Sequence, residues 1–132
     1  MGKVDKIILS ILAIEHLGFG IYGLYAPVSI AELIGYELGS EFAYSEIRAN
    51  YAMFTVLGLM AFFSIFIKSI ARQTYLIYVI IFSSLASGRI LNYFITGDSA
   101  TSIIVAVVAE ILVVGLCLWR LAANKKEIET VD

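Results

Sequence analysis

Four long stretches of the chain consist mostly of apolar residues and are separated by more polar segments. They cover residues 7–26, 46–67, 74–95 and 99–121. Each has about the 20 residues that an α-helix needs to cross the hydrocarbon core of a bilayer. Inside that core the backbone must satisfy its own hydrogen bonds, so each stretch should be a helix. The pattern predicts an all-α integral membrane protein in which four helices form a bundle, with residues 1–132 as a single domain.

The connections between the predicted helices differ in length. The second and third are short, which implies antiparallel neighbouring helices, and Ser99 is placed to cap the fourth helix. The first connection, residues 27–45, has apolar residues at the i, i+3, i+4, i+8 spacing of a helix: Ile30, Leu33, Ile34 and Leu38. We expect a short amphipathic helix on the outer membrane surface, ended by Gly35 or Gly39, with an interfacial loop as the alternative. The polar tail, residues 124–132, is expected to fray.

Composition indicates the same class of protein. Of the 132 residues, 61% are hydrophobic and only 15% are charged, which is more apolar surface than a soluble domain of this size can bury. The formal net charge of -2 argues against a nucleic-acid partner. The one cysteine, Cys117, excludes a disulfide within the chain. The lipid bilayer is therefore the first partner that the sequence predicts.

The charges outside the apolar stretches predict the orientation. Basic residues precede the first stretch, separate the second from the third and stand at the end of the chain, from the last turn of the fourth stretch onward: Lys3, Lys6, Lys68, Arg72, Arg120, Lys125 and Lys126. The other two connections carry acidic residues and no basic ones: Glu32, Glu37, Glu41 and Asp98. Basic segments stay on the cytoplasmic side of a membrane. We therefore expect both termini in the cytoplasm.

Two glutamates lie near the middle of two apolar stretches, and two arginines lie in or at the ends of the other two. Glu15 is about 12 Å from the start of the first stretch, and Glu110 is about 16 Å from the start of the fourth, at about 1.5 Å per residue. Both therefore lie near the middle of the membrane, whereas Arg48 and Arg89 lie nearer its outer surface. Charged side chains are costly in a bilayer and face protein or water. They predict a polar pocket that opens toward the outer side.

Helical periodicity indicates which polar residues share a face. Glu15 lies on one stripe with Tyr22, and Arg89 lies on one stripe with Asn92 and Tyr93. In the second stretch, Glu46 and Arg48 point in nearly opposite directions. The candidate ligand-binding residues are Glu15, Tyr22, Glu46, Arg48, Asn50, Tyr51, Arg89, Asn92, Tyr93 and Glu110.

The same charges also have a purely structural interpretation. Glu15 with Arg89, or Glu110 with Arg48, would form ion pairs that fix the register of the helices. His16 adjoins Glu15, but no Glu-x-x-His or His-x-x-x-His spacing supports a metal site. The sequence has no phosphate-binding loop, nucleophile motif or haem motif. We therefore expect no metal, no cofactor and no catalytic residue.

Small residues recur in the predicted helices and suit close contact between them. We interpret them as packing positions without a chemical role. They are Gly18, Gly20, Gly23, Gly58, Ser83, Ser84, Ala86, Ser87 and Gly88.

Two motifs resemble those of a family of small bacterial four-helix membrane proteins that is known only as a domain of unknown function. The motifs are Ser45-Glu46-Ile47-Arg48-Ala49-Asn50-Tyr51 and Gly88-Arg89-Ile90-Leu91. The resemblance covers nearly the whole chain and includes Glu15, Asp98 and Glu110. The chain departs from it at Tyr51-Ala52-Met53, where the family often has Tyr-Gly-Gly, and at Gly97-Asp98, where the family's Asp-Gly turn is reversed. The resemblance implies a four-helix protein of the bacterial inner membrane. The chain is also broadly similar to DoxX-like four-helix membrane proteins, some of which are linked to quinone redox chemistry.

Three functions are compatible with these features. We favour binding or transport of a small polar, anionic or lipid-like ligand, attracted by Arg48 and Arg89 and positioned by Glu15 and Glu110. A transporter this small would have to form a homo-oligomer. The second function is a structural or accessory subunit whose ion pairs fix helix packing or dock a membrane protein partner. The third is a quinone- or lipid-linked enzyme with a glutamate as proton relay. The missing motifs favour a protein that is not an enzyme.

Overall fold

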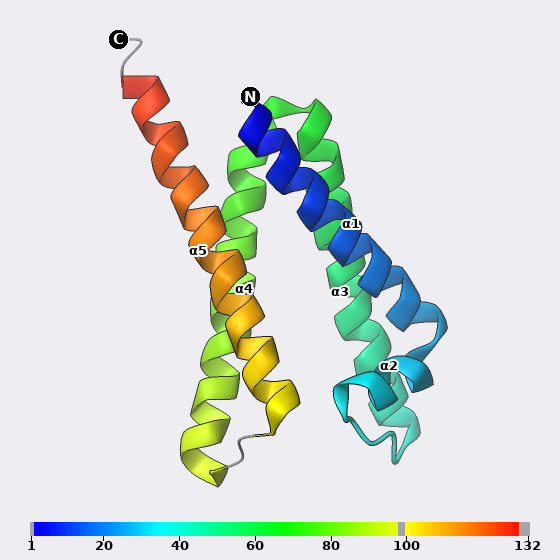
Figure 1. Ribbon diagram of the computed structural model, residues 1–132. Helices are drawn as coiled ribbons and strands as arrows, with labels where there is room; N and C mark the ends of the chain where they lie inside the picture. Colours follow the sequence, from blue (N-terminus) through cyan, green and yellow to red (C-terminus); the bar gives the residue numbers. More distant parts are fainter. Residues whose placement is uncertain (1, 98–99, 130–132) are drawn as a thin grey trace. The chain divides into compact units, whose positions relative to one another are not determined.

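The computed structural model describes residues 2–97 and 100–129, with side chains as far as Ala123. Every element in this part of the chain is an α-helix (Figure 1). The helices are α1 (Lys3–Tyr25), α2 (Pro27–Ile34), α3 (Glu41–Phe66), α4 (Lys68–Thr96) and α5 (Thr101–Glu129). Four of them, all except α2, are long and apolar enough to cross a membrane. The predictions of an all-α fold and of four membrane-length helices are confirmed, and they indicate a multi-pass membrane protein.

The helices extend beyond the predicted stretches at several ends. α3 begins at Glu41 because Ser40 caps it: the backbone N–H of Ala43 donates to the Ser40 hydroxyl oxygen at 3.2 Å. α4 begins at Lys68, so that Ile67 alone separates it from α3. The predicted capping residue Ser99 lies, with Asp98, outside the described residues. The tail, expected to fray, is helical as far as Glu129, and its lysine and glutamate residues favour continuation of α5.

The chain divides into two compact units. The N-terminal unit, residues 1–71, contains α1, α2, α3 and the first turn of α4. The C-terminal unit, residues 72–132, contains the rest of α4 and α5. The single domain expected from the sequence stays a prediction.

In the N-terminal unit, α1 packs along α3 at very short range (Figure 1). Glycines make this approach possible. A Cβ atom at Gly20 would lie 2.6 Å from the backbone nitrogen of Thr55, and one at Gly58 would lie 2.6 Å from the backbone nitrogen of Leu17. These distances leave no room for a side chain on either residue. The prediction that small residues serve close helix contacts is confirmed at both positions, whereas Gly18 and Gly88 have open space around them.

The short helix α2 fills the connection between α1 and α3. Pro27 occupies its first turn, and Gly35 ends it in the left-handed conformation, with a φ of 73°. A short helix with a glycine stop is confirmed, and the alternative of an irregular loop is wrong, whereas the place of this helix on the outer membrane surface stays a prediction. The predicted apolar stripe needs correction, because Leu33 is 67% exposed while Ile30 and Ala31 are buried. The buried face follows the i, i+3, i+4 spacing that starts at Pro27.

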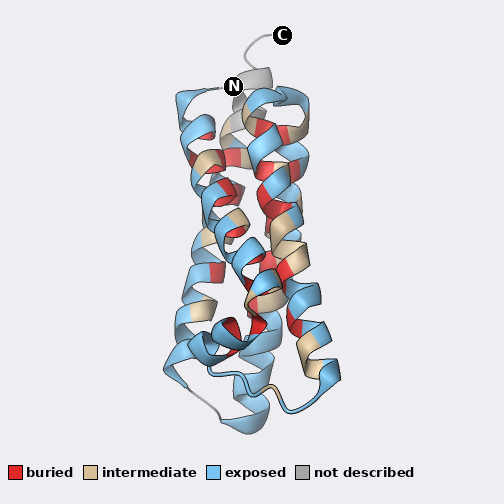
Figure 2. Cartoon of the chain, turned by 90° about the vertical axis from the view of Figure 1, so that its right-hand side faces the viewer, coloured by how far each residue is buried: buried red, intermediate tan, exposed pale blue. Residues whose placement is uncertain are grey.

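Large apolar side chains are exposed along all four long helices, and pale blue, the colour of exposed residues, covers much of each helix in Figure 2. Ile14 on α1, Phe66 on α3, Phe94 on α4 and Leu112 on α5 are each at least two-thirds exposed. So much exposed apolar surface is unfavourable in water and normally marks an interaction surface. It suits contact with lipid acyl chains, as expected for helices of this length and composition.

Candidate functional site

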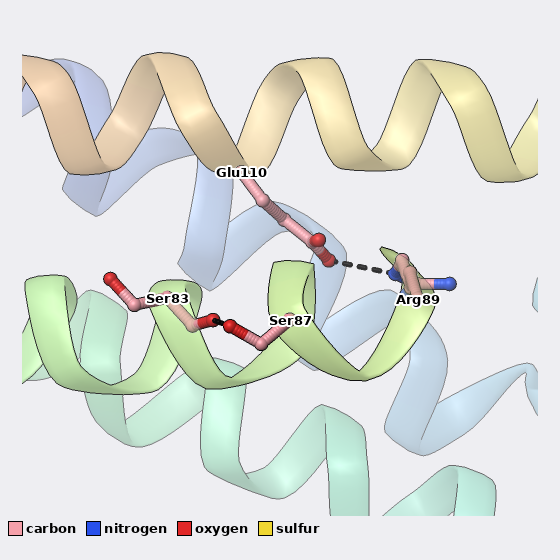
Figure 3. Close-up of polar contacts among 4 residues, drawn as sticks. All are labelled: Ser83, Ser87, Arg89 and Glu110. Atoms are coloured by element: carbon pink, nitrogen blue, oxygen red, sulfur yellow. Dashed lines mark hydrogen bonds and ion pairs between the residues drawn. The ribbon is translucent and has the colours of Figure 1, made fainter. Parts of the chain in front are cut away.

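An ion pair joins the two helices of the C-terminal unit. The Arg89 side chain on α4 donates from Nε to Oε1 of Glu110 on α5 at 2.9 Å (Figure 3). The Glu110 side chain is only 7% exposed, whereas that of Arg89 is 42% exposed. The pair therefore has a buried acidic end and an accessible basic end.

The two pairings weighed from the sequence, Glu15 with Arg89 and Glu110 with Arg48, would each join the two units and stay predictions. Within the C-terminal unit, the structure pairs Arg89 with Glu110. The reason lies in the short connection between the helices. Arg89 lies 7 positions before the end of α4 (residues 89 to 96), and Glu110 lies 9 positions after the start of α5 (residues 101 to 110). At 1.5 Å per residue, both are at a similar distance from the same connection.

The second oxygen of the Glu110 carboxylate, Oε2, is not used by the ion pair with Arg89. Oε2 is buried and has no hydrogen-bond partner among the described residues. An ionised carboxylate has room for several donors, and an unsatisfied buried oxygen costs about 1–3 kcal/mol. Buried polar atoms of this kind are uncommon, and a chemical role or a bound group is one explanation for them. Glu110 is therefore only half satisfied in the arrangement that the structure shows.

An apolar hollow of about 340 Å³ lies beside the ion pair, between α4 and α5. Its lining residues come in equal numbers from the two helices and are, apart from one arginine and one tyrosine, purely hydrophobic: Arg89, Ile90, Tyr93, Phe94, Ile103, Ile104, Val107 and Val108. The volume falls in the range of small-molecule sites. The hollow thus combines aliphatic and aromatic walls with a single cationic group.

Hydroxyl groups on α4 near Arg89 are directed back to their own helix. The Ser87 hydroxyl donates to the carbonyl oxygen of Ser83 at 2.7 Å, and Ser84 donates to the carbonyl oxygen of Ile80 at 2.8 Å (Figure 3 shows the first of these). The Thr96 hydroxyl donates in the same way to the carbonyl oxygen of Asn92 at 2.9 Å. These hydroxyls donate to backbone carbonyl oxygens, whereas the Nε–H of Arg89 donates to Glu110.

The structure brings together only part of the predicted site. In the C-terminal unit, Arg89 and Tyr93 line the hollow and Glu110 anchors Arg89. Asn92, on the same helix, is exposed but is not among the lining residues. The ring of Tyr93 makes an edge contact with that of Phe94, at 5.8 Å between centroids.

In the N-terminal unit, the predicted stripe on α1 is present. Glu15 and Tyr22 line one side of a second hollow, about 400 Å³, together with Ile14, Gly18 and Phe19. All five residues come from one helix, so this hollow is a depression along α1. The Glu15 side chain is about half exposed, and its Oε2 lies 4.0 Å from Nδ1 of His16.

His16 itself is buried and is positioned by its own helix. Its Nδ1 lies 2.9 Å from the carbonyl oxygen of Leu12, and its ring meets that of Phe54 on α3 edge-on, at 5.7 Å between centroids. A histidine held in this way contributes to the packing between α1 and α3. In the described part of the chain, no group of three or more His, Cys, Asp or Glu residues is arranged to hold a metal ion.

The candidate residues on α3 differ in how far they are buried. Glu46, Arg48 and Asn50 are exposed. Tyr51 is buried, with its ring directly against Gly23 of α1 and in edge contact with Phe54 at 5.5 Å. It belongs to an apolar cluster with Ile30, Ala31 and Ile47. The structure therefore gives Tyr51 a packing environment, while its proposed contact with a ligand stays a prediction.

Sequence reasoning missed most of the apolar walls beside Arg89. A signal for them is present in the sequence, because Ile103, Val107 and Glu110 recur at the i, i+4, i+7 spacing of one helix face. Ile90 and Phe94 follow the same spacing on α4. Apolar residues in an apolar helix do not by themselves indicate a binding site. Only the position of Arg89 on α4 identifies this face of α5 as part of a site.

Comparison with known proteins identifies the family of the chain. No curated protein and no solved structure matches it. A family model described as a domain of unknown function, DUF4345, matches residues 4–121. This range contains nearly all of the four membrane-length helices, together with both residues of the ion pair. The chain therefore belongs to the DUF4345 family.

Proposed function

We propose that the chain is a small integral membrane protein that binds an anionic, lipid-like ligand between α4 and α5. The headgroup would bind to Arg89, and the apolar tail would occupy the hollow beside it. One observation carries the proposal: the accessible end of the Arg89–Glu110 ion pair lines a hollow of about 340 Å³ whose other walls are almost entirely apolar.

The headgroup chemistry follows from the guanidinium group. It has five N–H donors, of which Nε–H is used by Glu110. In Figure 3, a terminal nitrogen of Arg89 is turned away from Glu110. Terminal N–H groups of arginine bind carboxylate, phosphate or sulfonate oxygens in pairs, and these charge-assisted hydrogen bonds are among the strong ones. An anionic headgroup is therefore the best partner for the free part of Arg89.

The tail chemistry follows from the walls. Ile103, Ile104, Val107 and Val108 present only hydrocarbon, and Phe94 adds an aromatic surface. Each methylene group transferred there from water would contribute about 0.8 kcal/mol. A polar ligand without a tail would gain nothing from these walls, so an amphiphile suits the hollow better than a small inorganic anion does.

We also propose that the helices form an antiparallel bundle with both termini in the cytoplasm, in the inner membrane of a bacterium. The uneven distribution of basic residues supports the orientation. Within the N-terminal unit, Leu17 faces Gly58, Gly20 faces Thr55 and Gly23 faces Tyr51, which supports opposite directions for α1 and α3. A reporter that fluoresces only in the cytoplasm, fused after Asp132, would be dark if this orientation were wrong.

A second function, structural support, is favoured by a different observation. The 2.9 Å ion pair links two helices, and one of its residues is almost fully buried. Such a pair can fix the register of the helices without any ligand. In that case, removing Arg89 would reduce stability, and no amphiphile would bind to the unmodified protein.

The test is a binding measurement on the full chain in nanodiscs of zwitterionic lipid, with octanesulfonate as the probe. We expect one probe per chain and at least a tenfold loss of affinity in Arg89→Ala, because a charge-assisted hydrogen bond contributes about 1.5–3 kcal/mol. Arg72→Ala, an exposed arginine on the same helix, is the matched control and should bind like the unmodified protein.

Two further measurements sharpen this test. Ethanesulfonate has the same headgroup with almost no tail, so it should bind much more weakly than octanesulfonate. Val107→Phe narrows the hollow and should weaken octanesulfonate more than ethanesulfonate. Equal binding of octanesulfonate to the unmodified protein and to a monodisperse Arg89→Ala variant would rule out the proposed site.

A further inference from the structure

The charge balance at Arg89 and Glu110 constrains what can bind there. The guanidinium carries one positive charge and the carboxylate one negative charge, so the ion pair is neutral as it stands. On the two helices around it, Tyr93 is the only other titratable residue within two turns of Arg89, and residues 101–116 contain none besides Glu110. No further cation on these segments is available to compensate for an added charge.

An anionic headgroup at Arg89 would leave the site with one uncompensated negative charge. Within a membrane-length helix, an unpaired charge is strongly unfavourable because the surroundings are apolar. Arginine cannot adjust, since its guanidinium group stays protonated in proteins. The carboxylate of Glu110 can, because the addition of a proton removes its negative charge.

The hydrogen bonds of Glu110 identify where this proton would go. Oε1 accepts from Nε of Arg89, and a protonated carboxyl group can keep this bond through its carbonyl oxygen. Oε2 is buried and has no partner among the described residues, so a proton there displaces no hydrogen bond that the structure shows. The half-satisfied carboxylate is thus already arranged to take up a proton without disturbing Arg89.

We propose that the binding of an anionic headgroup at Arg89 is coupled to the uptake of one proton at Oε2 of Glu110. This inference rests on the proposed function. The proton comes from the solvent and converts the Glu110 carboxylate into a neutral carboxyl group, while the anion takes its place as the counter-charge of Arg89. No other covalent bond forms or breaks. Binding of the ligand therefore becomes stronger as the pH falls.

The experiment measures proton uptake directly. Octanesulfonate stays ionised throughout the pH range in which proteins are stable, so any proton taken up must bind to the protein. Calorimetric titration of the full chain in nanodiscs, in two buffers with different heats of ionisation, gives the number of protons per bound probe. We expect about one proton per probe, and a dissociation constant that rises by up to about tenfold per pH unit, as linkage of one proton requires.

Variants assign the proton to Glu110. Glu110→Gln keeps a carbonyl oxygen for Arg89 but cannot be ionised, so we expect it to bind the probe without proton uptake and with a flat pH dependence. The matched control is Glu41→Gln, an exposed acid in the first turn of α3, which should take up the same proton as the unmodified protein. Should Glu110→Gln fail to fold, infrared difference spectra of the unmodified protein provide the second measurement. Addition of the probe should produce the C=O stretch of a protonated carboxyl group.

The outcomes separate this inference from the proposed function. Probe binding without proton uptake, or without the new infrared band, would overturn the coupling and leave the binding site standing. Proton uptake that persists in Glu110→Gln would also overturn it, because the proton would then belong to another group. A folded protein that binds no octanesulfonate would overturn the proposed function and the coupling together.

Discussion

Gly58 of α3 lies directly against the backbone of Leu17 of α1, so close that a Cβ atom on the glycine would be 2.6 Å from the Leu17 nitrogen. The neighbouring atom is backbone, which cannot move aside without shifting the whole helix. Packing of α1 against α3 therefore depends on the absence of a side chain at this position. The same geometry occurs one turn away, where Gly20 meets the backbone of Thr55.

Gly58→Ala should destabilise the protein, by about 1–3 kcal/mol for an overpacked contact. Gly18→Ala is the control: it also places a methyl group on a long helix, but nothing lies within 4 Å of its Cβ position. Alanine favours a helix over glycine by up to about 1 kcal/mol, so this variant should be neutral or slightly stabilising. Thermal unfolding of both variants in the same detergent, followed by circular dichroism, gives the comparison. Equal melting temperatures would contradict the close contact.

Gly23 and Tyr51 should behave as a coupled pair. The tyrosine ring occupies the space next to Gly23, so Gly23→Ala forces the ring to move and should lower stability. Tyr51→Leu removes most of the ring and creates room for the alanine methyl group. The double variant should therefore be more stable than the sum of the two single changes predicts, by about 0.5–3 kcal/mol for residues in contact. Strict additivity would show that the two positions do not touch.

Gly35 should resist replacement for a conformational reason. Its φ of 73° lies in the left-handed region, where residues other than glycine are strained, and the space around it is open. Gly35→Ala should cost about 1–2 kcal/mol, and asparagine, which tolerates this region better, should cost less. Gly39→Ala, in the same connection and also in open space, is the control. Stabilities would be compared by thermal unfolding, and similar losses at both glycines would count against a conformational cause.

Arg89 and Glu110 should show coupled effects on stability as well as on binding. Arg89→Ala leaves a buried carboxylate without its only observed partner in the described residues, which should cost about 1–3 kcal/mol. Glu110→Gln removes the negative charge, so Arg89→Ala should be less damaging in its presence. A double-mutant cycle by thermal unfolding in detergent measures this difference. A coupling energy near zero would mean that the 2.9 Å contact contributes nothing to stability.

The helices were predictable from the sequence because length and hydropathy are sufficient to recognise a membrane-length helix. The short helix α2 was predictable too, because a proline start and a glycine stop surround an apolar helical pattern. The buried face of α2 was not predictable from the sequence. The stripe beginning at Ile30 and the one beginning at Pro27 both have helical spacing, and only the positions of α1 and α3 determine which of them is covered.

The partner of Arg89 was not predictable either. Periodicity gives the face of a helix on which a residue lies, but it does not say which helix that face meets. Glu15 and Glu110 are expected at similar depth, so depth does not separate them. Tyr51 illustrates a related limit. A tyrosine on a polar stripe suits a pocket and a packed core equally well, and only the absence of a side chain at Gly23 provides the space that its ring fills.

A ribosome releases the chain from its N-terminus, so α1 emerges well before the helix that it packs against. The contact of Gly20 with Thr55 and that of Leu17 with Gly58 can form only after α3 has been made. Once residues 1–71 have left the ribosome, every contact within the N-terminal unit can form. The ion pair between Arg89 and Glu110 forms only after both of its helices have been made. Assembly during synthesis can therefore proceed one unit at a time, and a stalled chain from which residues 1–71 have fully emerged should already hold α1 and α3 together.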